Sequence, residues 1–110
     1  GNIPVRVLLP GKSRWKRGHA MWVSDVFAWR SSPAGWSEDL CQVERATIRA
    51  ASAEEQKQLH GIGDDPVVAR LEIVGREPIT VAASSADRAA LMGSVGDRDP
   101  AEAPEAAVTR

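Results

Sequence analysis

The chain has 110 residues, which is enough for one compact domain but not for two domains with separate cores. Its 14 basic and 15 acidic residues give a formal net charge of -1, so the overall charge does not point to a polyanionic partner. Apolar residues make up 43% and charged residues 26%, which is typical of a folded globular domain. No apolar run approaches the roughly 18 to 20 residues that a membrane-spanning helix needs.

The first thirty residues are predicted to form β-strands. Residues 3–9 are β-branched and leucine-rich and are followed by Pro10-Gly11, a pattern typical of a strand entering a turn. Residues 20–23 and 26–29 are apolar and flank Ser24-Asp25. This arrangement predicts a hairpin with a tight polar turn.

The middle of the chain is predicted to continue the sheet and then to form a short helix. Residues 40–50 mix apolar and charged side chains, which indicates one or two half-exposed strands. Ser52 and Glu55 have the spacing of a capping box, in which each side chain bonds a backbone amide at the start of a helix. We expect this helix to end at about His60.

The last part is predicted to be a hairpin, a helix and a tail. Residues 67–74 alternate between two faces, one nearly all apolar, and residues 78–82 would form the partner strand. Ser84 is a candidate N-cap for a short helix that ends at Gly93. Residues 96–110 contain almost no large apolar side chain, so they are predicted to be a disordered tail after a single domain at 1–95.

The aromatic residues are four Trp and one Phe, all placed between Trp15 and Trp36. Phe27, Trp22 and Trp29 are interpreted as core residues of the early hairpin, whose turn can bring the two tryptophans together. Trp36 is interpreted as the anchor of the next loop. Only Trp15, which cations flank, keeps a functional interpretation.

These elements predict a mainly β (α+β) fold. A terminal helix after the last strand favours a pleckstrin-homology-like antiparallel β-barrel of about seven strands, with the helix closing one open end. A helix between later strands would also suit an OB-like barrel, which remains the alternative.

The candidate binding site follows the first predicted strand. Residues 1–30 carry six basic residues and one acidic residue, a balance of +5. The cations are concentrated around one indole, which could stack or enter a headgroup layer while the cations neutralise phosphates. The predicted ligand-binding residues are Lys12, Arg14, Trp15, Lys16 and Arg17.

No catalytic, metal or cofactor site is expected. His19, Cys41 and His60 are the only His and Cys residues, and their spacing matches neither a metal site nor a nucleophile with its base. Cys41 is interpreted as a small buried hydrophobic residue. The chain is therefore predicted not to be an enzyme.

Seven segments, taken in chain order, carry a resemblance: Arg14–Gly18, Val26–Arg30, Val43–Ala46, Ala53–Glu55, Val67–Val68, Ile79–Ala82 and Ala86–Leu91. Over about residues 3–95 they resemble a family of short actinobacterial proteins of unknown function. The resemblance implies an N-terminal transmembrane helix followed by a pleckstrin-homology-like domain, with no catalytic residues. Because the chain begins Gly1-Asn2-Ile3 without Met, we expect a preceding segment to have been removed, either such an anchor or another domain.

The predicted function is that of a non-enzymatic binding module at the cytoplasmic face of the plasma membrane, or in the cytoplasm if no anchor exists. Its partner would be a protein or an anionic membrane surface. The alternative is an OB-like domain that binds single-stranded nucleic acid.

Overall fold

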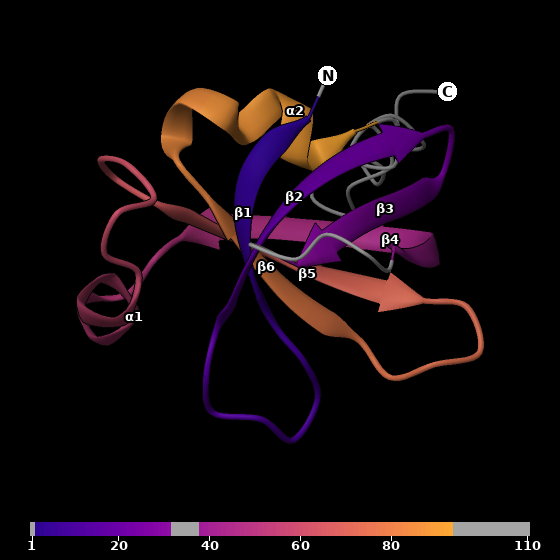
Figure 1. Ribbon diagram of the computed structural model, residues 1–110, viewed down its shortest axis with the longest axis horizontal. Helices are drawn as coiled ribbons and strands as arrows, with labels where there is room; N and C mark the ends of the chain where they lie inside the picture. Colours follow the sequence, from indigo (N-terminus) through magenta and orange to yellow (C-terminus); the bar gives the residue numbers. More distant parts are fainter. Residues whose placement is uncertain (1, 32–37, 94–110) are drawn as a thin grey trace, which may run out of the picture.

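The computed structural model describes residues 2–31 and 38–93. They form six strands, two short α-helices and one 3-10 turn (Figure 1). The strands are β1 (Ile3–Leu8), β2 (Lys16–Val23), β3 (Val26–Ser31), β4 (Glu38–Ala50), β5 (Val67–Ile73) and β6 (Ile79–Ala83). The helical elements are α1 (Ala53–Gln58), η1 (Ser85–Asp87) and α2 (Arg88–Met92).

Each strand is antiparallel to the next one in the chain, and β1 also pairs with β6, so the sheet closes on itself. The prediction of a mainly β antiparallel fold with a short C-terminal helix is confirmed, but the described residues form six strands where about seven were expected. Residues 40–50 belong to one strand, β4, whose pairing with β5 shifts between Val43 and Arg45. This irregularity lets a 13-residue strand bend within a strongly curved sheet.

The core lies inside the closed sheet because alternate side chains of every strand point inward. Strand β5 shows the pattern predicted from its sequence, since Val67, Ala69, Leu71 and Ile73 are all buried. The other strands supply the rest of the cluster, which includes Val5, Val7, Phe27, Cys41, Val43, Ile79 and Val81.

Helix α2 packs against one end of the sheet (Figure 1). Its Leu91 side chain is fully buried. The indole Nε1 of Trp22 donates a hydrogen bond of 3.0 Å to the Leu91 carbonyl. The helix ends at Gly93 as predicted. Ser84 is the N-cap residue of η1, but its hydroxyl donates to a carboxylate oxygen of Asp87 at 3.4 Å and makes no capping bond to the backbone.

Helix α1 lies outside the sheet. Its capping box is confirmed, since the Glu55 amide donates to Ser52 Oγ at 3.1 Å and the Ser52 amide donates to Glu55 Oε1 at 2.9 Å. The helix ends at Gln58, two residues before the predicted end. The segment after it builds a second apolar cluster on the outer face of β5 and β6, made of Ala51, Leu59, Ile62, Val68 and Ala82.

The expected meeting of Trp22 and Trp29 across the hairpin is wrong. The register places Trp22 opposite Phe27, with ring centroids 5.3 Å apart in an edge-on arrangement, and Trp29 opposite Ala20. The two tryptophans are therefore in different pairs of the ladder. The predictions for Trp36 and for a tail at 96–110 concern residues outside the described ranges.

Candidate ligand-binding site

A pocket of about 520 Å³ lies in the connection between β1 and β2. Strand β1 ends at Leu8, and Gly11, with a φ of 75°, reverses the chain in a turn that the Lys12 amide closes by donating to the Leu9 carbonyl at 3.1 Å. A positive φ is a conformation that favours glycine. The pocket is lined by Leu9, Lys12, Ser13, Arg14, Trp15 and Lys16.

Four of the five predicted site residues line this pocket, and Trp15 holds it in place. Its Nε1 donates a hydrogen bond of 2.9 Å to the Gln58 side chain at the end of α1. Its ring packs, half-buried, against the outer apolar cluster. Trp15 thus ties the loop to the segment that covers β5 and β6. No sequence pattern identified Gln58 as a partner of Trp15, because the two residues are 43 positions apart in the chain.

The other three lining residues that were predicted, Lys12, Arg14 and Lys16, are exposed cations. The ion pairs found in the described ranges join Arg30 to Glu38, Arg49 to Glu55 and Arg76 to Asp39. None of the three pocket cations is paired with a described carboxylate. Their charges are therefore available to a ligand.

Arg17 lies outside the pocket, on the outer face of β2. It stands directly opposite Arg6 of β1, a residue that the sequence analysis missed. The Arg6 guanidinium donates to the backbone carbonyls of Val5 at 3.4 Å and His60 at 3.3 Å. Alternation along β1 could have placed Arg6 on the outer face, but its partner depends on the register of the two strands.

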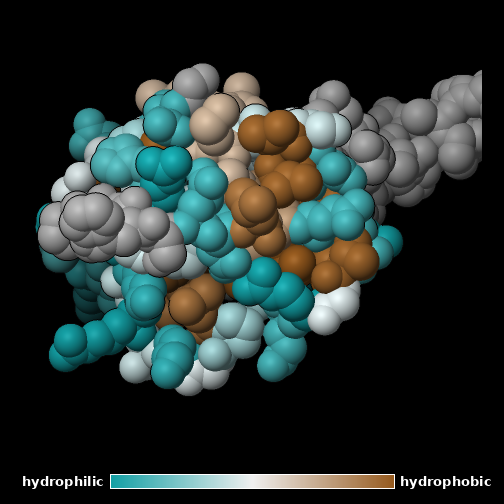
Figure 2. All heavy atoms as spheres, turned by 45° about the vertical axis from the view of Figure 1, so that its right-hand side comes forward, coloured by the Kyte–Doolittle hydropathy of each residue, from teal (hydrophilic) through white to brown (hydrophobic). Residues whose placement is uncertain are grey.

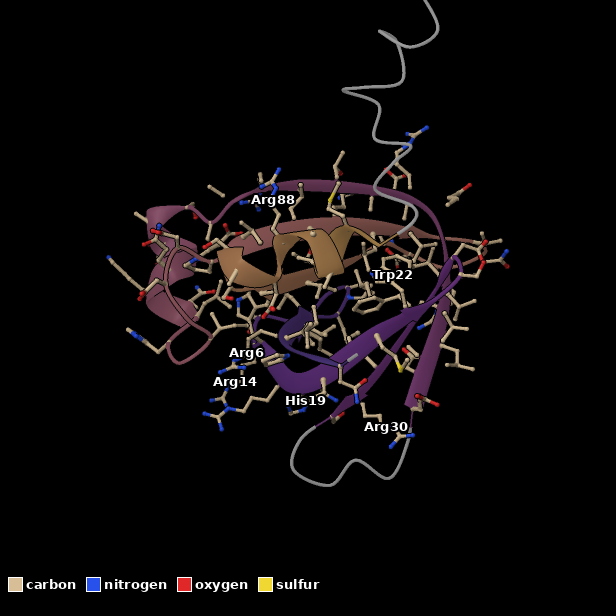
Figure 3. All side chains as sticks on the ribbon, turned by 90° about the horizontal axis from the view of Figure 1, so that it is seen from above. Arg6, Arg14, His19, Trp22, Arg30 and Arg88 are labelled. Carbon is tan, nitrogen blue, oxygen red and sulfur yellow. The ribbon has the colours of Figure 1, made fainter. Side chains whose placement is uncertain are left out.

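The pKa of Arg6 is lowered, first by partial burial and then by the charge of Arg17. Both causes disfavour the charged guanidinium. In Figure 3, Arg6 and Arg14 extend on the same side of the molecule. The cations of the loop and of the β1–β2 ladder thus extend the positive character of the site beyond the pocket.

The cysteine and the two histidines do not form a reactive group. Cys41 is fully buried inside the sheet, and burial, followed by the nearby Asp39 carboxylate, raises the pKa of its thiol. A raised pKa keeps the thiol protonated and a poor nucleophile. No three His, Cys, Asp or Glu side chains of residues 2–31 and 38–93 are grouped as metal ligands.

A second, smaller pocket of about 330 Å³ lies at the end of the sheet away from α2. Its lining includes Lys16 and Trp29. The indole Nε1 of Trp29 is buried without a hydrogen-bond partner among the described residues. Such a group is unusual, since most buried polar atoms are paired.

The outer face of β2, β3 and β4 carries exposed apolar side chains, visible as a brown area in Figure 2. Met21 and Leu40 flank Ala28 in one row of the ladder, and Val23 lies in the next. None of these exposed apolar side chains lines the pocket between β1 and β2.

No family model, curated protein or solved structure matches the chain. The resemblance to the actinobacterial family was therefore wrong. Its expected transmembrane helix finds no support either, because no helix in the described part of the chain is long and apolar enough to cross a bilayer.

Proposed function

We propose that the chain is a non-enzymatic binding module that attaches to an anionic membrane surface through the loop between β1 and β2. The observation that carries the proposal is the set of three exposed cations, Lys12, Arg14 and Lys16, which line one pocket without a described acidic partner. Basic residues near an anionic membrane surface contribute about 1 kcal/mol each to binding.

The order of the strands supports a pleckstrin-homology-like arrangement over an OB-like one. Every pairing joins strands that follow one another in the chain, except the closing pair of β1 and β6. An OB-fold is a five-stranded Greek-key barrel, which needs a non-sequential neighbour in addition to the pair that closes the barrel. The terminal helix that packs on the end of the sheet also suits the first arrangement.

The environment of Trp15 weighs against the nucleic-acid alternative. Its N–H group is used by Gln58 and its ring packs on the outer cluster. Binding of single strands depends largely on bases stacking on aromatic rings that are free to receive them. The site therefore offers charge more readily than a stacking surface.

The test is co-sedimentation with vesicles of phosphatidylcholine alone or mixed with phosphatidylserine, at low and high salt. We expect binding to the anionic vesicles only, with release as the salt concentration rises. A variant that combines Lys12→Gln, Arg14→Gln and Lys16→Gln should lose about 3 kcal/mol, a drop of roughly a hundredfold in partitioning. The matched control, Arg45→Gln with Arg70→Gln and Arg88→Gln, removes three exposed cations elsewhere and should bind nearly as well.

Equal partitioning to neutral and anionic vesicles would overturn the proposal. Two other polyanions, each tested for binding at low salt, distinguish the remaining candidate partners. Binding to polyglutamate without binding to vesicles would indicate an acidic protein surface. Binding to an oligothymidylate without binding to vesicles, accompanied by quenching of tryptophan fluorescence, would restore the nucleic-acid alternative.

A further inference from the structure

Arg6 and Arg17 form a pair of like charges on the outer face of the β1–β2 ladder. The register places them directly opposite each other, and like charges at such positions destabilise a sheet. Neither side chain makes an ion pair within the described ranges. No carboxylate in the described ranges therefore neutralises the repulsion between the two arginines.

The Arg6 guanidinium is also held in position. Its two terminal nitrogens each donate to a backbone carbonyl, one of Val5 in its own strand and one of His60 after α1. The turn that follows α1 approaches closely, since a Cβ at Gly61 would lie 3.5 Å from Arg6 Nη2. A guanidinium has five N–H donors, so several remain for a ligand after these two bonds.

We propose that Arg6 and Arg17 together bind a phosphate monoester group, the chemistry shared by a lipid headgroup with a terminal phosphate and by free phosphate. A monoester carries a charge between about -1.5 and -2 near neutral pH, which matches two arginines. Guanidinium groups bind phosphate oxygens through paired hydrogen bonds that lysine cannot make. A phosphate bound between the two guanidinium groups would attract both of them and so offset their mutual repulsion.

This inference deepens the proposed function, because the pair belongs to the same hairpin as the pocket cations. It makes a separate claim, however. The pocket cations explain attraction to any anionic surface, whereas the arginine pair predicts a preference for one kind of anionic group. The two claims can therefore fail independently.

The experiment compares vesicles containing phosphatidic acid, a phosphate monoester, with vesicles containing phosphatidylserine, a diester, matched in zeta potential. The whole chain should bind the first at least about tenfold more tightly. Arg6→Gln and Arg17→Gln should each abolish this preference, and Arg17→Lys, which keeps the charge, should weaken it strongly. Arg45→Gln, which removes an exposed cation of β4, is the matched control and should preserve it.

Inorganic phosphate identifies the source of the group and checks folding. If free phosphate is bound, it should raise the melting temperature above that in chloride at equal ionic strength, and Arg17→Lys should reduce the rise. If only the lipid headgroup is bound, the preference for phosphatidic acid should appear without that rise. Both results support the site, and near-ultraviolet circular dichroism of each variant shows that it is folded.

Equal binding to the two anionic vesicles, together with no effect of phosphate on the melting temperature, would overturn the arginine site and leave the proposed function standing. A preference that survives Arg6→Gln and Arg17→Gln would also overturn it. Absence of binding to any anionic vesicle, with a phosphate effect that Arg17→Lys reduces, would overturn the proposed function and support the arginine site.

Discussion

The two α-helices are of similar length but are held to the sheet in opposite ways. Helix α1 begins with a complete capping box and has no buried residue. Helix α2 has no side-chain cap but inserts Leu91 into the core and bonds Trp22 through its last turn. Short helices are marginal without outside support. At α1 most of that support comes from local hydrogen bonds, with one long-range bond from Trp15 to Gln58. At α2 it comes from contacts between distant parts of the chain.

In this comparison, the largest effect is expected for Leu91→Ala. The substitution removes a fully buried side chain at the end of the core, and such changes cost about 2 to 5 kcal/mol of unfolding free energy. Urea denaturation followed by tryptophan fluorescence measures the loss. Leu40→Ala is the control, because Leu40 is 59% exposed and should change stability by less than about 0.5 kcal/mol. Equal losses would show that α2 does not contribute to the core.

Gly93→Ala should have the next largest effect, a loss of about 2 to 3 kcal/mol. Gly93 has a φ of 60° and a ψ of -163°, a region that only glycine readily adopts. A Cβ there would also lie 2.5 Å from the Trp22 ring. Gly75→Ala is the matched control, because its φ is also positive, 74°, but nothing lies within 4 Å of the added atom. The difference between the two melting curves reports the contact with Trp22 together with the difference in backbone strain between the two positions.

A pair of Trp→Phe substitutions compares the two ends of the sheet. Trp22→Phe removes a hydrogen bond to Leu91, whereas Trp29→Phe removes an N–H that has no described partner. A net hydrogen bond contributes about 1 kcal/mol. We therefore expect Trp22→Phe to lower the denaturation free energy by about 1 kcal/mol more than Trp29→Phe. The reverse order would mean that Trp29 has a bound partner in solution.

The smallest effect is expected at α1, where Ser52→Ala should cost about 1 kcal/mol. The bonds from Arg49, followed by those at the helix start, lower the pKa of Glu55 to about 2. A carboxylate with a lowered pKa stabilises the fold above its ordinary value of 4.5, and that contribution is lost as the pH falls from there toward 2. Glu55→Gln should flatten this part of the stability profile, measured by denaturation at several pH values. An unchanged profile would contradict the pairing with Arg49.

The contrast between local contacts and contacts between distant parts of the chain also explains what could be predicted from the sequence. The capping box of α1 and the apolar face of β5 are local patterns, and both were found. The partner of Arg6 depends on the register of β1 and β2, and the partner of Trp15 lies 43 residues away. No local pattern encodes such contacts. The loop cations were identified as a group, but their division between a pocket and a strand face required the fold.

Closure of the sheet limits how any macromolecule can be held. Because β1 pairs with β6, every strand of the described sheet pairs with two neighbours over at least part of its length, and none presents a whole unpaired edge. Proteins that bind peptides by adding a strand need such an unpaired edge, and edges are also where sheets aggregate. Recognition by this sheet must therefore use side chains and loops, and the chain should resist assembly into extended β-sheet fibres while it is folded.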